Sequence, residues 1–250
     1  MPFWKALASY LKRPHRIPER LIERSMNKKA QHYYAAQSEA DNDLERETLL
    51  GEAARVFTDE ARATAIYKRI ARDRSNKIIA SQTTSLDDCI TMYVLVRIYK
   101  PSIMAETGVF YGAMSAMILE AMSMNGHGKL YSIDLPFPED GLPLEERGGL
   151  VPQERRSNWE LIFGDSREKL PPLLEQLKSI DAFNHDSLHT TTHMRWEYET
   201  AWSYIKSGGI LSSHDVLTTP AWTNFCRRHR AEIQLSGRVY GLGIAVKASN

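Results

Sequence analysis

The sequence predicts an α/β fold, with a parallel sheet covered by helices on both faces, in the part of the chain after Pro101. Short apolar runs alternate there with helix-forming stretches, as in a series of strand–helix–strand units. The end of the chain differs, because segments 232–238 and 240–247 adjoin around Gly237 and predict an antiparallel hairpin. With 250 residues, 42% of them hydrophobic, the chain is long enough to bury a core without disulfide or metal cross-links.

The predicted elements follow one another from residue 42 onward. A helical pattern covers 42–72, and a second helix begins after the N-cap residue Ser85 and ends before Pro101. The strands are five apolar runs, at 103–106, 130–134, 159–164, 180–186 and 209–215. Helices are expected between and after them, at 112–124, 168–177, 191–205 and 220–229. Residues 135–158 form a long loop rich in proline, glycine and charge, and loops of this length are commonly functional.

Two domains are expected, a helical N-terminal extension at 1–80 and a single α/β domain at 81–250. Residues 1–30 are basic and residues 38–60 are acidic, and the first helix carries its apolar side chains on one face. We expect this extension to pack on its own domain as a lid, or on a second copy of the chain, which would make a homo-oligomer. A helix that lies on a membrane surface is the alternative interpretation.

The composition argues against several classes of function. The net charge is +1, from 32 basic and 31 acidic residues, so no partner nucleic acid is expected. No apolar run approaches the ~20 residues that span a bilayer. The two cysteines, Cys89 and Cys226, match neither a disulfide scaffold nor a zinc site, and the expected location is therefore the cytoplasm.

The first segment that carries chemistry is the glycine turn, residues 105–112, which reads Ala-Glu-Thr-Gly-Val-Phe-Tyr-Gly. Its glycines let the backbone turn sharply and approach a ligand, and the helix that follows favours an anion at its start. The spacing is not GxGxxG, and a turn that simply needs two glycines explains it equally well. The next two strands also end in polar residues. Asp134 is placed to accept the hydroxyls of a ribose, and Asp165 with Ser166 suits the edge of an adenine.

A second group of polar residues follows the fourth and fifth strands. Asp186 and His189 come after the fourth strand, and His214 and Asp215 come after the fifth. The carboxyl ends of parallel strands lie at one edge of a sheet, where two carboxylates and an imidazole can hold a divalent cation. A neutral His189 can also accept a proton from a hydroxyl group near pH 7. Alternatively, the four-residue spacing of the histidines from 185 to 193 forms a polar helix start without chemistry.

Five segments together, in order and spacing, resemble class I S-adenosylmethionine-dependent methyltransferases: ETGVFYG, YSIDLP, NWELIFGDSREKLPPLL, IDAFNHDSLHTTTHMRWEYETAW and GGILSSHDV. The resemblance covers residues 80–248 and is greatest to the small-molecule O-methyltransferases related to macrolide-sugar and catechol O-methyltransferases. It implies a Rossmann-like seven-stranded sheet of order 3-2-1-4-5-7-6 with an antiparallel last strand. It also implies S-adenosyl-L-methionine as the cofactor.

The resemblance further implies roles for single residues. The expected cofactor contacts run from the methionine end to the adenine, at Glu106, Gly108, Gly112, Ser115, Asp134, Asp165 and Ser166. In the resembling branch, a metal is held at the positions of Asp186, His214 and Asp215, and a general base occupies the position of His189. That branch usually has an acid or an Asp-Asn pair after the fifth strand. His214 departs from this pattern, which favours Mn²⁺ over Mg²⁺, or a site without metal.

The sequence thus predicts an O-methyltransferase that acts on a hydroxyl of a small metabolite, a sugar or a polyketide-type natural product. Asp186 and His189 are the expected catalytic residues, assisted by a divalent metal. Two alternatives remain open: a metal-independent N- or C-methyltransferase of the same fold, and a non-catalytic cofactor-binding scaffold protein.

Overall fold

The computed structural model describes residues 86–136, 144–236 and 241–248. The predicted extension at 1–80, the helical pattern at 42–72, the N-cap residue Ser85 and Gly237 lie outside these ranges. The structure therefore bears on the α/β domain, and the extension stays a prediction.

Helices and strands alternate along the chain in the predicted order. The elements are α5 (Leu86–Tyr99), β1 (Ile103–Thr107), α6 (Ala113–Asn125), β2 (Lys129–Asp134), the 3₁₀ helices η1 (Leu144–Glu146) and η2 (Gln153–Asn158), β3 (Trp159–Phe163), α7 (Ser166–Leu177), β4 (Ile180–His185), α8 (Thr191–Trp202), β5 (Ile205–Ser213), α9 (Ala221–His229), β6 (Glu232–Ser236) and β7 (Leu242–Val246). The largest boundary difference is at β5, which was expected at 209–215 and begins four residues earlier. Ile205, expected to end a helix, begins β5, where it is buried and pairs with Ile180.

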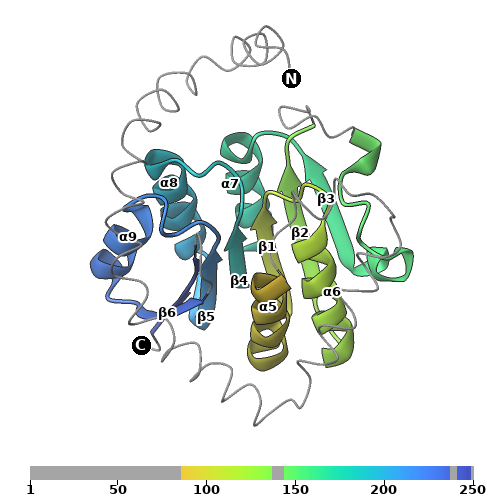
Figure 1. The fold of residues 1–250 in the computed structure, drawn as a ribbon, viewed down its shortest axis with the longest axis horizontal. Helices are drawn as coiled ribbons and strands as arrows, with labels where there is room; N and C mark the ends of the chain where they lie inside the picture. Colours follow the sequence, from red (N-terminus) through yellow and green to blue (C-terminus); the bar gives the residue numbers. More distant parts are fainter. Residues whose placement is uncertain (1–85, 137–143, 237–240, 249–250) are drawn as a thin grey trace, which may run out of the picture.

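The seven strands form one sheet of order β3-β2-β1-β4-β5-β7-β6 (Figure 1). The pairs from β3 to β5 are parallel, and β7 runs antiparallel to both β5 and β6. The expected strand order and the antiparallel last strand are therefore confirmed. The terminal hairpin also explains why the end of the sequence shows no helix between its two apolar segments.

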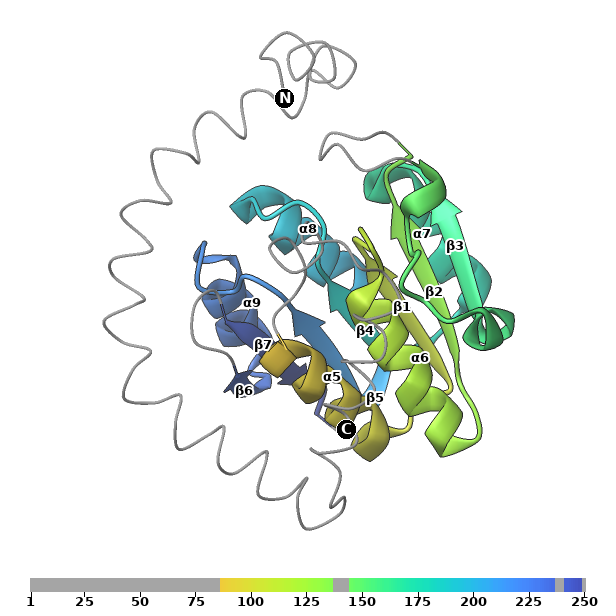
Figure 2. The same ribbon diagram turned by 45° about the vertical axis from the view of Figure 1, so that its right-hand side comes forward.

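Helices cover both faces of the sheet (Figures 1 and 2). Helices α5 and α6 pack on one face, and α7, α8 and α9 pack on the other. Neighbouring residues of β1 show how a strand serves both faces, because Met104 is buried under the first pair of helices and Ala105 under the other three. Both faces are thus apolar, which is why the strands read as continuous hydrophobic runs.

The register of the sheet brings the ends of four strands to one edge. Thr107, the last residue of β1, lies beside Ile133 of β2 and His185 of β4, and His185 lies beside Ser213 of β5. The turns that follow these strands are therefore neighbours in space, although up to about a hundred residues separate them in sequence. Most of the polar residues selected from the sequence lie at these strand ends or on the turns that follow them, whereas Ser115 lies in α6, and Asp165 and Ser166 follow β3.

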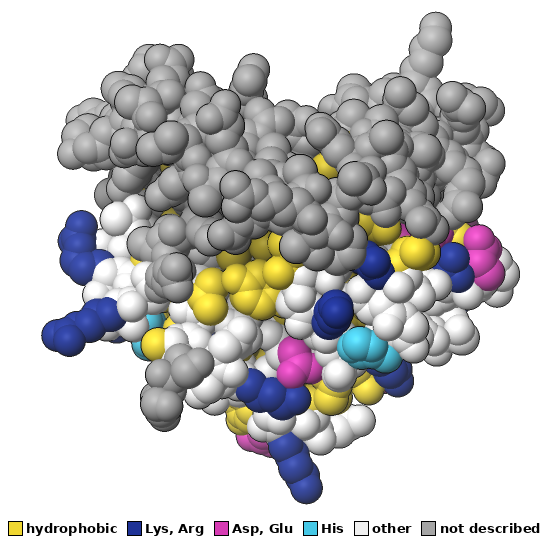
Figure 3. Space-filling view, turned by 90° about the horizontal axis from the view of Figure 1, so that it is seen from below, with side chains coloured by type: hydrophobic (Ala, Val, Ile, Leu, Met, Phe, Trp, Pro, Cys, Tyr) yellow, Lys and Arg dark blue, Asp and Glu magenta, His cyan; other side chains and the backbone are white. Residues whose placement is uncertain are grey.

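The described helices include none that is both long and apolar enough to cross a bilayer. Lysine and arginine side chains on the coloured part of the face in Figure 3 are scattered over it, with acidic, histidine and apolar side chains between them. The coloured residues of that face therefore show no continuous basic stripe of the kind that tracks a nucleic acid backbone.

Candidate functional site

Gly108 brings the glycine turn into contact with the turn after β4. Its φ is +85°, and a Cβ atom there would lie 1.9 Å from the carbonyl oxygen of Asp186. The amide of Gly108 donates to Ile133 O at 2.9 Å, and the amide of Asp186 donates to Thr107 O at 2.8 Å. Only glycine allows this approach, so Gly108 joins the two groups of polar residues that the sequence placed separately.

Glu106 is completely buried at the end of β1. Its Oε1 accepts hydrogen bonds from Ser115 Oγ and from Ser132 Oγ, the latter at 2.6 Å, and the indole N–H of Trp159 donates to Ser132 Oγ at 2.7 Å. Burial raises the pKa of Glu106 to about 7, although the two hydroxyl donors oppose the shift. Its other oxygen, Oε2, has no hydrogen-bond partner among the described residues. A buried carboxyl with one open acceptor suits the ammonium group of a ligand.

Two residues expected to contact the cofactor have protein partners in the structure. Ser115 is completely buried and donates to Glu106. Gly112 precedes α6 with φ +84°, and a Cβ there would lie 2.8 Å from the Cα of Gly148. The structure therefore places Ser115 behind Glu106 and Gly112 against the long loop, and direct cofactor contacts for them stay predictions.

Asp134, at the end of β2, is held by backbone amides and by an arginine. Its Oδ2 accepts from the amide of Phe110 at 3.0 Å and from Arg147 Nη1 at 2.8 Å, and its Oδ1 accepts from the amide of Leu135 at 2.9 Å. Burial raises the pKa of Asp134 despite the opposing charge of Arg147. The carboxylate is thus tied to the glycine turn, and its contact with a ribose stays a prediction. Nothing in the sequence distinguishes Arg147 from the other arginines of the loop.

Asp165 and Ser166 lie at the start of α7, and both are buried. Asp165 caps this helix, since its Oδ1 accepts from the amide of Arg167 at 3.0 Å. Ser166 Oγ lies 3.1 Å from His193 Nε2. Helix capping and this contact explain both side chains locally, and the adenine contact expected of them stays a prediction.

The imidazole of His189 lies between two carboxylates. Its Nε2 is 3.5 Å from Asp186 Oδ1, and its Nδ1 is 3.4 Å from Asp215 Oδ2. Removal from water lowers the pKa of His189, but the two carboxylates outweigh this effect and raise it. The pKa of Asp186 is lowered, because His214 and His189 outweigh its own burial. The three side chains are each about one quarter exposed, at 25%, 23% and 28%. A ligand can therefore contact the edges of these side chains, although His189 Nε2 itself is buried and has no hydrogen-bond partner among the described residues.

The expected metal ligands do not form a metal site in this arrangement. Among the described residues, no three His, Cys, Asp or Glu side chains converge as ligands. His189 lies between Asp186 and Asp215, where a shared cation would have to bind. The Nε2 of His214 is buried without a hydrogen-bond partner among the described residues. The donor set thus fits a protonated imidazole better than a divalent metal.

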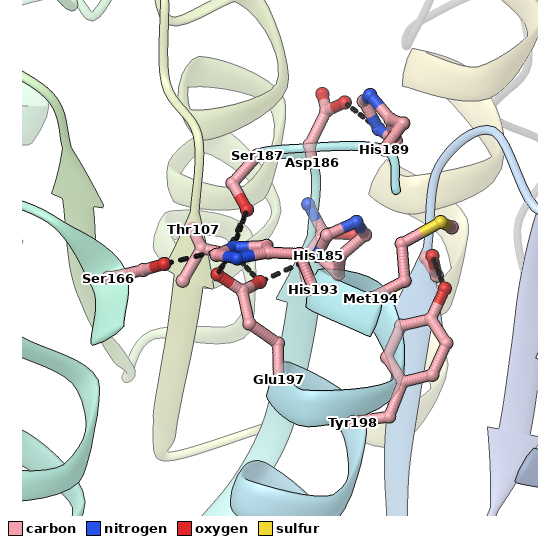
Figure 4. Close-up of polar contacts among 12 residues, drawn as sticks. Thr107, Ser166, His185, Asp186, Ser187, His189, His193, Met194, Glu197 and Tyr198 are labelled. Carbon is pink, nitrogen blue, oxygen red and sulfur yellow. Dashed lines mark hydrogen bonds and ion pairs between the residues drawn. The ribbon is translucent and has the colours of Figure 1, made fainter. Parts of the chain in front are cut away.

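A buried polar cluster, which sequence reasoning left without chemistry, lies beside these residues (Figure 4). Its centre is the carboxylate of Glu197 from α8, which contacts His185 and His193. The sequence offered one signal for it, the four-residue spacing of His193 and Glu197 on one helix. Glu197 was missed because the other residues around it are far away in sequence.

Residues 105–216 match a protein family described as a methyltransferase domain. This part of the chain is a methyltransferase domain. The match contains every residue singled out above, from Glu106 to Asp215. A comparison of the sequence with curated proteins finds no match.

Solved structures share the fold of this methyltransferase domain at low sequence identity. The O-methyltransferase TomG from Streptomyces achromogenes, involved in tomaymycin synthesis and solved with S-adenosylmethionine, is 14% identical, with a TM-score of 0.53 over 75% of this chain and 90% of its own. The O-methyltransferase from Bacillus cereus, solved with S-adenosylhomocysteine, is 13% identical, with a TM-score of 0.53 over 73% and 91%. A methyltransferase from Podospora anserina, also solved with S-adenosylhomocysteine, is 11% identical, with a TM-score of 0.52 over 82% and 95%.

At these identities the likeness shows the fold, which is that of the class I S-adenosylmethionine-dependent methyltransferases. The predicted fold and the predicted class of enzyme are thereby confirmed.

Proposed function

We propose that this protein transfers the methyl group of S-adenosylmethionine to a hydroxyl oxygen of a small molecule, and that His189 takes up the hydroxyl proton. The observation that carries the proposal is the position of His189 between Asp186 and Asp215, at the edge where Gly108 touches the same turn. A base of raised pKa beside the cofactor turn is what O-methylation requires, because a neutral hydroxyl is a poor nucleophile.

The residues of the glycine turn fit the proposed cofactor. The open Oε2 of buried Glu106 can accept a hydrogen bond from the ammonium of its methionine part, and the carboxylate of Asp134 can accept from the ribose. When bound, S-adenosylmethionine supplies the methyl group, which leaves the sulfonium sulfur as the oxygen–carbon bond forms. The task of the protein is then to place the acceptor oxygen in line and to remove its proton.

His189 and its two partners can perform that task. A neutral His189 accepts the proton, and the resulting imidazolium lies between the side chains of Asp186 and Asp215. The charge that develops on the imidazole is thus stabilised where it forms. No step in this scheme requires a metal.

The acceptor, the location and the assembly state belong to the same proposal. A sugar or polyketide-type acceptor is supported by the resemblance of the site segments to enzymes of that branch. A location in the cytoplasm is supported by the two cysteines, Cys89 and Cys226, which are both buried and free. A homo-oligomer formed through residues 1–80 rests on the charge and amphipathic pattern of that segment alone.

The test is methyl transfer from methyl-tritiated S-adenosylmethionine to a panel of glycosides and phenolic polyketides, with NMR of the product to locate the methyl group. We expect a methyl ether.

His189→Ala should lower kcat by about 100-fold or more, the usual contribution of a general base, and should leave the calorimetric Kd for S-adenosylhomocysteine nearly unchanged. His127→Ala, an exposed histidine after α6, is the matched control. A methyl group on nitrogen or carbon would favour the alternative enzyme, and equal losses of turnover and cofactor affinity would make His189 structural.

A further inference from the structure

The carboxylate of Glu197 is completely buried and accepts four hydrogen bonds (Figure 4). Thr107 Oγ1 donates to Oε2 at 2.5 Å, and His185 Nδ1 lies 2.6 Å from the same oxygen. Ser187 Oγ donates to Oε1 at 2.9 Å, and His193 Nε2 lies 2.8 Å from it. One side chain of α8 therefore ties together the ends of β1 and β4 and the first turn of its own helix.

Burying a carboxylate at this position costs desolvation free energy. Its burial opposes ionisation, but the two histidines and their hydrogen bonds hold the pKa of Glu197 well below its usual range. An apolar side chain of similar size would pack without a desolvation penalty. A buried charge with four donors does something that apolar packing cannot, because it fixes the direction of each donor.

The four donors do not depend equally on Glu197. Thr107 is already held by the sheet, since β1 pairs with β2 and β4 on either side. Ser187 lies two residues beyond His185, the last paired residue of β4, and its hydroxyl contacts are with Glu197 and His193. His185 and Ser187 flank Asp186, and the ring of His185 lies edge-on to the ring of His189, with 5.3 Å between centroids. Loss of the Glu197 carboxylate would therefore free the Ser187 side chain first and loosen the turn that follows β4, while the paired strands stay in place.

We propose that Glu197 is a positioning residue for methyl transfer, which holds Ser187 and His185 so that Asp186 and His189 face the acceptor. The inference rests on the proposed function. It goes beyond that function by assigning the orientation of the site to a side chain that touches neither cofactor nor acceptor.

The test compares Glu197→Gln with wild type in the full-length protein. We expect kcat to fall about 10- to 100-fold, the usual effect of a small misplacement of reacting groups, while the Kd for S-adenosylhomocysteine changes little. Glu199→Gln is the matched control. It removes a carboxylate two residues away on the same helix, where Glu199 pairs with Arg228 and His229 near the surface, and kcat should stay unchanged.

Ser187→Ala tests the same connection without a change of charge, and it stays informative if Glu197→Gln does not fold. Its kcat should fall about tenfold, and the double variant should be no slower than Glu197→Gln alone, because both changes break one connection. If the two losses multiply, Glu197 does not act through Ser187, and the proposal is wrong.

Amide hydrogen exchange gives a readout that needs no turnover. In Glu197→Gln and Ser187→Ala, the amide of Asp186, which donates to Thr107 O, should exchange at least about tenfold faster, and the amides of β1 should keep their protection. Unchanged exchange in this turn would overturn the proposal. If the wild type transfers no methyl group to any panel member, the proposed function fails, and the exchange result alone still decides whether Glu197 orients the turn.

Discussion

Buried acids in this protein differ in charge state because their hydrogen-bond donors differ. Glu106 receives only serine hydroxyls, and its pKa rises to about 7. Glu197 contacts two histidines as well as hydroxyls, and its pKa is lowered. Two hydroxyl donors do not offset the burial of Glu106, whereas the interactions of Glu197 with the two imidazoles outweigh its burial. A glutamate can thus serve as an open hydrogen-bond acceptor, as Glu106 does at the end of β1, or as a fixed anion, as Glu197 does on α8.

The pH dependence of turnover should follow His189. A base must be unprotonated, and the carboxylates raise the pKa of His189 above its ordinary 6.5. We therefore expect kcat to be low below pH 6.5, to rise with pH and to reach a plateau above the raised pKa. Asp215→Asn removes a charge that raises the pKa, so the midpoint should move to lower pH. A profile of kcat against pH for both proteins measures this shift. Equal midpoints would mean that Asp215 does not raise the pKa of His189.

Cofactor affinity should depend on Asp134. Asp134→Ala removes the carboxylate expected to accept from the ribose, and we expect the Kd for S-adenosylhomocysteine to rise about 10- to 100-fold, as for loss of a hydrogen bond to a charged group. Glu160→Ala is the control, since Glu160 is an exposed acid on the neighbouring strand that pairs with Lys129. Titration calorimetry compares the two. An unchanged Kd in Asp134→Ala would remove Asp134 from the ribose site.

At the scale of elements, the long loop after β2 is partly a support for the glycine turn. The amide of Gly148 donates to Phe110 O at 2.8 Å, and the amide of Leu150 donates to Tyr111 O at 2.9 Å. The ring of Trp159 fills the space beside Gly148, where a Cβ would lie 2.1 Å from the indole. The described part of the loop therefore fixes the backbone that carries the predicted cofactor contacts.

Contact between the turns after β1 and β4 should require Gly108. Gly108→Ala would place a methyl group against the backbone of Asp186, so we expect loss of cofactor binding and a clear fall in melting temperature. Gly126→Ala is a matched control, because Gly126 also has a positive φ, +77°, but nothing lies within 4 Å of its Cβ position. It should cost only about 1–2 kcal/mol of left-handed backbone strain and keep cofactor affinity. Calorimetry and thermal unfolding measure both effects, and equal behaviour of the two variants would argue against the contact.

At the scale of the whole molecule, the candidate site lies where the strand order reverses. From β1 the chain proceeds to β2 and β3 on one side, and then returns to β4 on the other side of β1. The connections after β1 and β4 therefore leave in opposite directions, and such a switch point is where open α/β sheets bind their ligands. Gly108 and Asp186 lie at this switch point, so the topology itself brings the predicted cofactor turn to the turn that carries the proposed base.

Turnover should be independent of divalent metal. His189 lies between the carboxylates of Asp186 and Asp215, so a cation would have to displace an imidazole that both carboxylates stabilise. We expect methyl transfer to persist after exhaustive dialysis against EDTA. If activity is lost and returns with Mg²⁺ or Mn²⁺, the divalent metal expected from the sequence takes part in the reaction. His189 would then have to move when the cation binds.

Much of the fold could be predicted because its signals are local. Alternating apolar and helical stretches predict the strands and helices, and the adjoining segments at the end predict the hairpin of β6 and β7. Ile205 was assigned to the wrong element because a buried isoleucine suits a helix end or a strand start equally well. Acids at strand ends, such as Asp134 and Asp186, were identifiable because parallel strands end at one edge.

The sequence by itself determined which chemical groups are available and at which edge of the sheet they gather, since both follow from local pattern and strand direction. Only the tertiary structure decided the partners of those groups. Arg147 donates to Asp134, His189 lies between two carboxylates, and Glu197 accepts from Thr107. Ninety residues separate Thr107 from Glu197, and no local pattern encodes such a pairing. It arises when the sheet register and the packing of α8 bring two distant backbones to within hydrogen-bonding distance.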